Sequence, residues 1–422
     1  MSNYKIVVFH PMQQHSFQTA AALKKGNILY QYWTSVYYQP KKLIYRLMNI
    51  FLSNNEKKKM HSRFYEPINN EVECFCTFYG MLFLITSRID KTKSKYFKLR
   101  SKDILIKKIG KKVAKKAIKE NVDYIISYDT WSYGLIKELK RKKSDIKVIM
   151  DCSSLYGEEI NEIMKADINN NYSNIGSYKN ILEQFSKKYI NKFRYEKDNT
   201  DYFFSPSTVV DKSFIKYGIN KKQIFRCTYG SYFKHIDYKK KKRSNITFIY
   251  IGRLSYAKGV HYLIKAFDNL KRNDYQLLLV GADTDDIAKT ITNKNIKVLG
   301  VVSHDKISSL LDKSDVIISA SLFDGFSLAL LEGAAYNLPI LCTTSNGASD
   351  YIINGINGYK FQSLNSSIIS KYVNSILDDK NCIDSMSKNI GKIVENLTWD
   401  NYYNDVINAI NSIINKENKN EE

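Results

Sequence analysis

Short hydrophobic runs alternate with segments of helical periodicity along most of the chain, and the runs form two series. The first series predicts five strands, at Lys5–Phe9, Tyr124–Ser127, Val148–Met150, Tyr202–Phe204 and Ile224–Arg226. The second series predicts five more, at Ile246–Ile251, Gln276–Val280, Ile296–Leu299, Val316–Ser319 and Pro339–Cys342. Alternation of strands and helices indicates a parallel α/β architecture, in which ligands bind at the carboxyl ends of the strands.

A polar and basic stretch without clear periodicity, Tyr229–Arg243, separates the two series. We therefore expect two doubly wound domains that face a cleft. The N-terminal domain is expected over residues 1–228, the linker over 229–244 and the second domain over 245–398. Residues 399–422 follow as a final segment.

Charge is distributed unevenly between the two halves of the 422-residue chain. Residues 1–228 hold 42 Lys and Arg against 21 Asp and Glu, whereas residues 229–422 hold 23 against 21, which together give the net charge of +23. Compositional bias would act on both halves, so the difference favours a functional basic face. Such a face attracts nucleic acid, an acidic membrane surface or a phosphorylated substrate.

Two N-terminal stretches combine basic with apolar residues. Ile106–Lys119 is typical of a surface helix, because its apolar positions share one face: Ile106, Ile109, Val113 and Ala117. Pro40–Arg63 mixes aromatic, aliphatic and basic side chains, and fits a packed surface helix and a contact with an anionic bilayer equally well. The best apolar run, Gly80–Ile85, is far shorter than the roughly 18 residues of a membrane span. With no signal-peptide layout and no disulfide or zinc spacing among six cysteines, we expect a cytoplasmic protein with free thiols.

The first motif with chemical character follows the strand Ile249–Ile251. Gly252 and Arg253 come directly after this strand, and Lys258 and Gly259 stand where a helix is expected to begin. A guanidinium, an ammonium and free helix-start amides would then surround one point, and these groups bind phosphate oxygens. The alternative is a pair of surface cations on a loop.

The second motif places two carboxylates eight residues apart around the start of a helix. Asp324 precedes the helix, and Glu332 lies within an otherwise apolar stretch of it. The backbone amides of Phe326, Ser327 and Leu328 would face an anion at this helix start. A buried glutamate needs a partner, which is supplied by a ligand or by a structural hydrogen bond.

Taken together, these segments resemble the family-4 retaining glycosyltransferases of GT-B fold, in a bacterial surface-polysaccharide branch. The resemblance is carried by the G-R-x-x-x-x-K-G pattern at Gly252–Gly259 and by the spacing of Asp324 and Glu332. Weaker likenesses extend over nearly the whole chain, at His10–Ser16, Asp201–Ser207, Tyr217–Ile219, Tyr229–Gly230, Thr344–Ala348 and Asn354–Tyr359. Trp399 opens a final helix, which in such enzymes crosses back to the N-terminal domain.

The resemblance implies two overlapping groups of site residues. The catalytic group is Arg253, Lys258 and Asp324. The donor-binding group is Gly252, Arg253, Lys258, Phe326, Ser327, Leu328 and Glu332. The two cations would hold the diphosphate of a nucleotide-sugar, Glu332 would bind the ribose hydroxyls, and Asp324 would contact the donor sugar.

Two departures from the family pattern bear on this site. The first carboxylate is Asp324 where the family commonly has Glu, and the shorter side chain bears on donor preference. Many relatives also carry a histidine in the loop that matches Ser127–Trp131, and none occurs here. Tyr128 and Asp129 are the candidates to position the sugar in its place.

The implied activity is transfer of a sugar from a nucleoside-diphosphate-sugar to an acceptor hydroxyl with retention, as a hexosyltransferase of class EC 2.4. A glycan or lipid-linked saccharide of cell-surface polysaccharide biosynthesis (capsule or lipopolysaccharide type) would bind the basic N-terminal domain, with peripheral contact at the inner face of the membrane. We expect no metal and no further cofactor, because the D-x-D at Asp283–Asp285 is typical of a structural helix start. His10 and His15 are expected to be structural as well.

Three other classes of protein remain open. A nucleic-acid-binding protein would explain the charge, but the chain has no known nucleic-acid-binding motif and the two site motifs would be left unexplained. A sugar-nucleotide epimerase of similar fold would need no acceptor. A catalytically inactive scaffold would fit the departure at Asp324.

Overall fold

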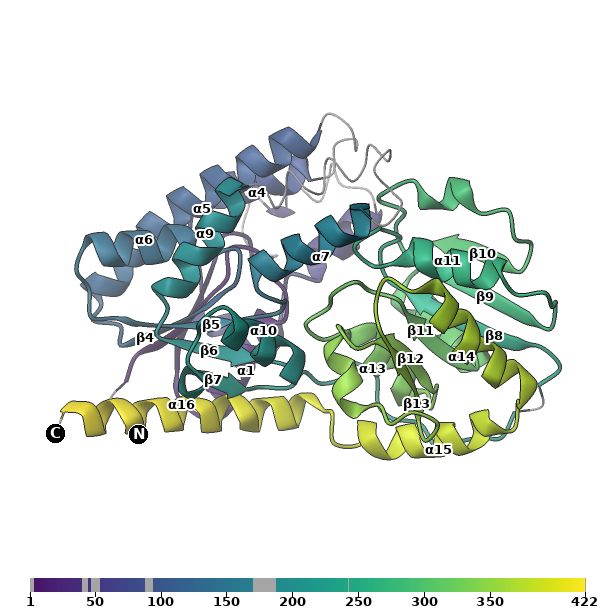
Figure 1. Cartoon of the computed structure of the whole chain (residues 1–422). Coiled ribbons are helices and arrows are strands. Elements are labelled where there is room, and N and C mark those ends of the chain that lie inside the picture. Colours follow the sequence, from purple (N-terminus) through teal and green to yellow (C-terminus); the bar gives the residue numbers. More distant parts are fainter. Residues whose placement is uncertain are drawn as a thin grey trace.

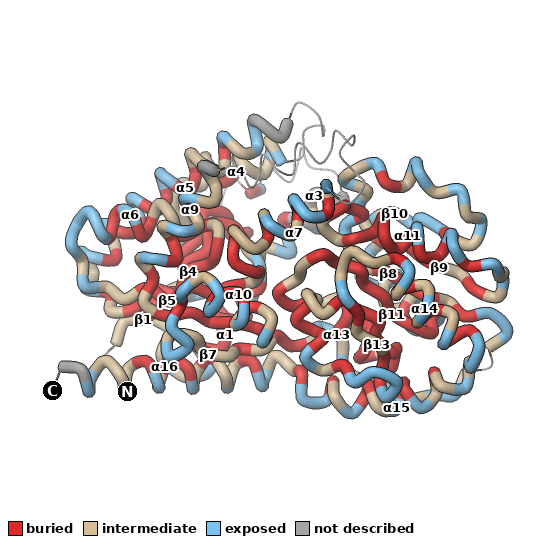
Figure 2. The backbone as a smooth tube through the Cα atoms, in the orientation of Figure 1, coloured by how far each residue is buried: buried red, intermediate tan, exposed pale blue. Residues whose placement is uncertain are grey.

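The chain folds into two parallel α/β domains that lie side by side (Figure 1). The computed structural model describes residues 4–39, 45–46, 54–87, 94–169, 187–241 and 243–421. Buried residues run along the strands of both sheets, and exposed residues line the outer helices (Figure 2). The predicted α/β class with two doubly wound sheets is confirmed, while the exact domain boundaries stay predictions.

The N-terminal sheet has seven parallel strands in the order β3-β2-β1-β4-β5-β6-β7. All five strands predicted for this half are present: β1 (Ile6–Phe9), β4 (Tyr124–Tyr128), β5 (Lys147–Asp151), β6 (Tyr202–Ser205) and β7 (Ile224–Arg226). Two strands at one edge were not predicted: β2 (Leu29–Thr34) and β3 (Val72–Cys74). Strand β1 pairs in parallel with β2 and with β4, where Ile6 lies opposite Tyr124, and β2 pairs in parallel with β3.

Alternate residues of β1 point to two different helix layers. Ile6 and Val8 belong to the core beneath α1 (Ser16–Lys25), whereas Val7 and Phe9 face α5 (Ser94–Lys119). The other helices among the described residues of this domain are α3 (Asn54–His61), α4 (Thr77–Thr86), α6 (Tyr133–Arg141), α7 (Gly157–Asn169), α9 (Lys187–Asp198) and α10 (Thr208–Lys216). Such alternation gives the sheet two buried faces, as doubly wound folds require.

The final helix, α16 (Trp399–Glu421), returns from the second domain and packs on α1 (Figure 1). Its apolar face, including Tyr402, Val406 and Ile410, is part of the N-terminal core. The Tyr402 hydroxyl also shares a 2.8 Å hydrogen bond with Thr19 of α1. The predicted crossover of the last helix is confirmed.

The two basic stretches of the N-terminal half have different outcomes. The expected surface helix at Ile106–Lys119 is confirmed, because its four apolar positions are buried in α5 against the sheet. Half of Pro40–Arg63 lies outside the described residues, which omit 40–44 and 47–53. Of the remainder, Tyr45 and Met60 are buried in one small cluster with Val36.

The C-terminal sheet has six parallel strands in the order β10-β9-β8-β11-β12-β13. The five predicted strands are present as β8 (Ile246–Ile251), β9 (Tyr275–Val280), β10 (Ile296–Gly300), β11 (Val316–Ser319) and β12 (Ile340–Thr343), and an unpredicted edge strand is β13 (Gly358–Phe361). Five helices flank this sheet: α11 (Val260–Asp268), α12 (His304–Lys313), α13 (Leu328–Ala335), α14 (Ser366–Asp378) and α15 (Cys382–Val394). Within the described part of the chain, every helix is too short or too polar to cross a bilayer.

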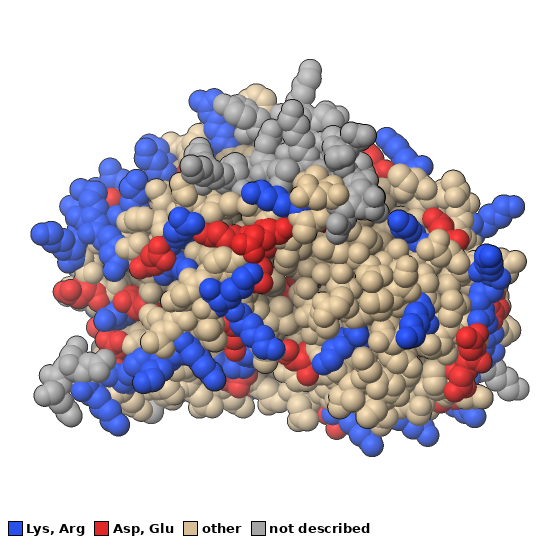
Figure 3. Space-filling model, in the orientation of Figure 1, with Lys and Arg blue, Asp and Glu red and all other residues tan. Residues whose placement is uncertain are grey.

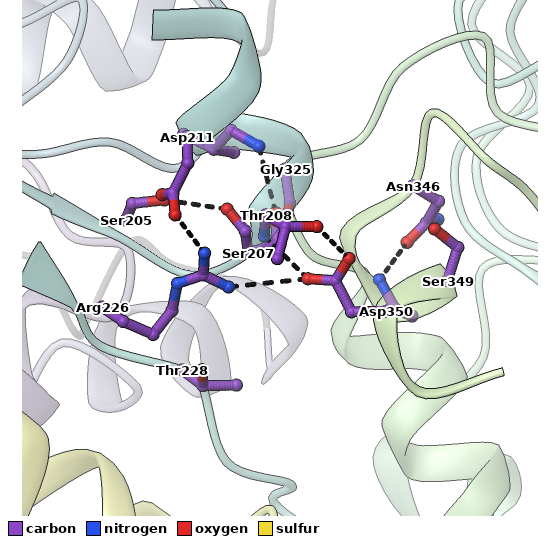
Figure 4. Close-up of polar contacts among 12 residues, drawn as sticks. Ser205, Ser207, Thr208, Asp211, Arg226, Thr228, Gly325, Asn346, Ser349 and Asp350 are labelled. Atoms are coloured by element: carbon purple, nitrogen blue, oxygen red, sulfur yellow. Dashed lines mark hydrogen bonds and ion pairs between the residues drawn. The ribbon is translucent and has the colours of Figure 1, made fainter. Parts of the chain in front are cut away.

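The two domains touch at the carboxyl ends of their strands. Ser207 donates a 2.7 Å hydrogen bond from Oγ to the Gly325 carbonyl, and the Thr208 amide donates to Asp350 at 2.7 Å (Figure 4). Arg226 adds ion pairs to Asp211 and to Asp350 in the same cluster. On the opposite side of the boundary, α7 reaches α11 through a 2.6 Å hydrogen bond from Tyr262 to Asp167. These contacts hold the domains close together around the site.

Arg243, at the start of the second domain, forms two ion pairs that we expect to stabilise the fold. Its guanidinium donates to Asp315 at 2.8 Å and also pairs with Asp384, and its side chain is only 8% exposed. We expect Arg243→Met to lower the free energy of unfolding by about 3 kcal/mol, because both carboxylates lose a buried partner. Urea denaturation measures this change, and Lys240→Met, at a side chain 80% exposed, is the matched control that should change little.

Candidate functional site

Lys258 and Asp324, which are 66 residues apart in sequence, meet at the carboxyl ends of β8 and β11. The Lys258 ammonium lies 2.6 Å from Asp324 Oδ2, and both side chains are partly buried. Gly259 makes this approach possible, since a Cβ there would lie 1.8 Å from the Ala320 carbonyl and its φ is +64°. The first predicted motif and the second therefore form one site.

Six of the eight predicted site residues line a single cavity: Gly252, Lys258, Asp324, Phe326, Ser327 and Leu328. Tyr250, Ser319 and Ser321 add hydroxyl groups to its wall. Arg253 and Glu332 lie outside this lining. Arg253 is exposed, and its guanidinium makes no hydrogen bond or ion pair with any described residue. Arg253 directly follows Gly252 of the lining, and an exposed, unpaired guanidinium is available to an anionic ligand.

The start of α13 presents free backbone donors to the cavity. Asp324 is fixed by the loop after β12, because its amide donates to the Ser345 carbonyl at 3.0 Å and its carbonyl accepts from Gly347 at 2.9 Å. Among described residues, no acceptor meets the amides of Phe326 and Ser327, which directly precede the helix. Free amides at a helix start bind anions, as expected for this position.

Glu332 lies in α13, partly withdrawn from water. Its carboxylate makes no hydrogen bond or ion pair with the described residues, so the structural partner considered for it is not found there. Burial raises the pKa of Glu332 to about 7. A carboxylate that is desolvated without a partner is costly, unless a ligand supplies hydrogen-bond donors.

The acidic segment Asp283–Asp285 is structural, as predicted. Asp283 accepts hydrogen bonds from the amides of Ile287 and Ala288, both at 3.0 Å. Asp285 accepts from the Tyr256 amide at 3.0 Å and so supports the loop that carries Lys258. In the described ranges, no three His, Cys, Asp or Glu side chains gather as metal ligands would.

The histidines of the first loop are buried in the N-terminal core. His15 Nε2 lies 2.8 Å from Asp151, which also accepts hydrogen bonds from Tyr229 and Tyr402. Asp151 thus ties the linker and α16 to β5, a role that the sequence did not indicate. His10 accepts from the Met12 amide at 2.9 Å, and burial lowers its pKa well below the usual value, so it is neutral.

The two candidates for sugar positioning differ in their placement. Tyr128 is fully buried and donates to Thr19 at 2.7 Å, so it does not reach the domain boundary. Asp129 lines a second cavity, together with Phe323 of the C-terminal domain. It accepts a 3.2 Å hydrogen bond from Ser153, whose carbonyl abuts Gly325 of the loop that carries Asp324. Asp129 is therefore the better placed of the two.

Two charged residues beside Asp129 were missed by sequence reasoning. Lys102 of α5 lies 4.3 Å from the centre of the Trp131 ring, and Glu196 of α9 accepts from the amides of Thr130 and Tyr133. Burial lowers the pKa of Lys102 to about 8 and raises the pKa of Glu196 to about 8 and that of Asp129 to about 6. These groups converge only through tertiary structure, so no local motif could have found them.

Fold and site together define a class of protein. Two Rossmann-like domains meet at the ends of their parallel strands, the second domain offers cations and free amides, and a helix from the end of the chain crosses back to the first. This arrangement is the GT-B fold.

Comparison with known proteins identifies relatives of the second domain. Residues 233–394 match the family described as glycosyl transferases group 1. The chain is 27% identical over 169 residues to the uncharacterized glycosyltransferase MJ1607 of Methanocaldococcus jannaschii, which covers 38% of this chain and 43% of that protein. It is 27% identical over 168 residues to the capsular polysaccharide biosynthesis glycosyltransferase CapM of Staphylococcus aureus, covering 38% and 44% of the two chains. The aligned segments thus span less than half the length of these relatives.

Solved structures extend the likeness over the whole chain. Sucrose-phosphate synthase from Thermosynechococcus elongatus superposes with a TM-score of 0.67 at 13% identity, over 98% of this chain and all of that one. HepE of Anabaena, in complex with UDP-glucose, superposes with a TM-score of 0.60 at 14% identity, over 97% and 99% of the two chains. At these identities the likeness shows the fold.

Proposed function

We propose that the protein is a retaining glycosyltransferase that moves a sugar from a nucleoside-diphosphate-sugar to an acceptor hydroxyl. The observation that carries this proposal is the convergence of Lys258, Asp324 and the free amides before α13 on one cavity. Glu332, a desolvated carboxylate without a protein partner, supports it as the acceptor for ribose hydroxyls. HepE, whose fold is similar, is described in complex with UDP-glucose.

Charge stabilisation is the main contribution that this site offers. In the transfer step, the bond between the anomeric carbon and the phosphate oxygen breaks, and the acceptor oxygen bonds to the same face of that carbon. Arg253 and Lys258 stabilise the charge that develops on the leaving phosphate, and that phosphate takes the acceptor proton. Lys258 is paired with Asp324, so a phosphate that binds Lys258 would compete with this contact and leave Asp324 to accept hydrogen bonds from the sugar hydroxyls.

The acceptor is proposed to bind the N-terminal domain, on the far side of the domain boundary. The cavity that holds Asp129 also touches Phe323, one residue before Asp324, so it adjoins the donor loop. The excess of basic residues in this half fits an acceptor that carries phosphate, such as a lipid-linked saccharide. CapM is named for capsular polysaccharide biosynthesis, and growth of a cell-surface polysaccharide is the pathway that we propose here.

The first test is donor binding, measured as the shift in melting temperature with a panel of nucleotide-sugars and free nucleotides. A ligand that binds only the folded state raises the melting temperature by mass action. We expect a shift with one nucleotide, lost in Arg253→Ala and in Glu332→Gln and retained in Glu395→Gln, an exposed glutamate of the same domain. Shifts that are indifferent to both site variants would overturn the proposed donor site.

Donor affinity is also expected to depend on pH through Glu332. Its pKa of about 7 means that the ionised form, which accepts the ribose hydroxyls, is scarce at about pH 6 and dominant at about pH 8. The dissociation constant of the nucleotide-sugar should therefore fall about tenfold over this range, and the fall should vanish in Glu332→Gln. Titration calorimetry measures it, and a nucleotide-sugar is the suitable probe because its diphosphate does not titrate there.

The raised pKa of Glu332 also affects the stability of the protein in the absence of donor, and here a rise in pH is unfavourable. The folded-state pKa of Glu332 lies above its unfolded value of 4.5, so its proton stabilises the fold at low pH. This contribution is lost as the pH rises from about 4.5 through about 7. Glu332→Gln should remove that part of the pH dependence, which urea denaturation at several pH values would detect.

A further inference from the structure

Helix α4 exposes an apolar stripe on the outer surface of the N-terminal domain. Phe78 and Ile85 are 73% and 55% exposed, and Leu82 lies between them. These residues are spaced i, i+4 and i+7, so they share one face of the helix. Of the ten residues of α4, only Gly80 is buried. An apolar face of this kind on a surface helix marks a site of interaction.

The opposite face of α4 is firmly packed, so the stripe has a fixed orientation. Tyr79, Phe83 and Leu84 pack against the core that α5 shares with the sheet. Thr86 Oγ1 and Ser101 Oγ of α5 share a 2.7 Å hydrogen bond. Gly80 allows the close approach to the sheet, because a Cβ there would lie 2.3 Å from Ser35 Oγ. The outward residues are therefore held out toward solvent by the helix itself.

Lysines of α5 stand beside α4, which packs along this helix. Lys108, Lys112 and Lys115 are exposed and form no ion pair with a described residue. Lys108 lies 6.0 Å from the centre of the Tyr79 ring in α4, and the charges of Lys108 and Lys112 both act on Cys76, directly before α4. Basic residues gather over this end of the molecule at the left of Figure 3, where α5 and α6 lie.

We propose that the α4–α5 surface, defined by Phe78, Leu82, Ile85, Lys108, Lys112 and Lys115, docks on an anionic lipid bilayer. Apolar side chains beside unpaired cations match the boundary between acyl chains and anionic headgroups. A polyanion such as nucleic acid would use the lysines and leave the stripe exposed to water. A second copy of this chain would bring like charges together. The docking element is thus α4, whose apolar run is too short to span a membrane but long enough to lie in its surface.

The test is cosedimentation of the full chain with vesicles of phosphatidylcholine, with and without phosphatidylglycerol. We expect binding only to vesicles with the anionic lipid. Phe78→Ser with Ile85→Ser should weaken binding at least about tenfold, because two large side chains no longer enter the bilayer. Lys108→Gln with Lys112→Gln and Lys115→Gln should weaken it about a hundredfold, at about fivefold for each charge.

Matched controls come from the C-terminal domain. Val301→Ser with Ile353→Ser removes apolar side chains that are 76% and 56% exposed, and Lys297→Gln with Lys306→Gln removes exposed charges. Both controls should bind the anionic vesicles as the unchanged protein does. Failure of the unchanged protein to bind, or full binding by the Phe78 and Ile85 variant, would overturn the proposal. If only the lysine variant loses binding to anionic vesicles, the surface binds a polyanion through charge alone, and the proposal of bilayer docking is overturned as well.

This proposal goes beyond the proposed transfer reaction, and its test is independent of it. Donor binding in the absence of vesicles should be unchanged in every α4–α5 variant, because these residues lie in the other domain from the donor cavity. Vesicle binding without any nucleotide-induced shift in melting temperature would overturn the proposed transferase activity and support the docking surface. A nucleotide-induced shift without vesicle binding would support the transferase activity and overturn the docking surface.

Discussion

Replacing Lys258 by methionine is expected to lower kcat/KM for sugar transfer by about 10²–10³-fold. Lys258 is the only cation among the described residues that line the proposed donor cavity, and methionine keeps its length without its charge. The developing charge on the leaving phosphate then loses its nearest stabilising partner. Asp324 also loses the ammonium 2.6 Å away, so a second negative charge in the cavity is left unpaired. Steady-state kinetics with the donor identified by thermal shift would measure the loss.

A neighbouring lysine provides the control for this experiment. Lys265→Met removes an exposed lysine from the adjacent helix α11 and should leave kcat/KM within about twofold. Lys258→Arg should recover part of the activity, because a guanidinium restores the charge but not the geometry. Equal activity of Lys258→Met and the unchanged enzyme would show that the leaving group is stabilised elsewhere.

Gly325→Ala is expected to lower the transfer rate by about 10²-fold while leaving donor binding intact. A Cβ at Gly325 would lie 2.2 Å from the Ser153 carbonyl oxygen of the other domain, and the three nearest atoms all belong to the backbone of Ser153 and Ser154. The two domains must then separate, which displaces Asp129 and the acceptor cavity from the donor loop. Misplacement of reacting groups by about 1 Å is enough for a loss of this size.

Solution scattering with and without the donor separates this effect from unfolding. Gly325→Ala should keep a larger radius of gyration than the unchanged protein under both conditions, with a similar melting temperature. Gly26→Ala is the matched control, since its φ is −80° and its nearest neighbour is the flexible side chain of Ile407 at 3.2 Å. If Gly325→Ala has the same radius of gyration and the same activity as the unchanged protein, the steric argument is refuted.

Most strands were predictable from sequence, whereas β2, β3 and β13, which lie at one side of their sheets, were not. Central strands of a parallel sheet are covered on both faces, so they are continuous apolar runs such as Ile6–Phe9. In contrast, β2 interrupts its aromatic residues with Gln31, β3 has only three residues, and β13 begins at Gly358. The backbone of Gly358 packs against Ile340, where a Cβ would lie 2.0 Å from the carbonyl oxygen. Close packing of this kind leaves no pattern in the sequence.

The same division applies to the site. The residues proposed to bind the donor come from two segments that each follow one strand, so local spacing was enough to single them out, and the structure brings six of the eight to one cavity. Lys102, Asp129 and Glu196 come from a helix, a turn and another helix, and only folding brings them together. The apolar residues of α4 stand out in the sequence, but which of them are exposed depends on which face of the helix packs against the core.

The return of α16 to the N-terminal domain sets the order in which that domain is completed during synthesis. Ala20 and Leu23 of α1 share their core with Tyr402, Val406, Ile410 and Ile413, and Tyr4 donates a 2.8 Å hydrogen bond to Asn418. A ribosome makes the N-terminal sheet first, but the helix that covers its α1 face leaves the exit tunnel only after the whole second domain. The second domain can therefore finish folding on the nascent chain while the α1 face of the N-terminal domain is still uncovered and accessible to chaperones.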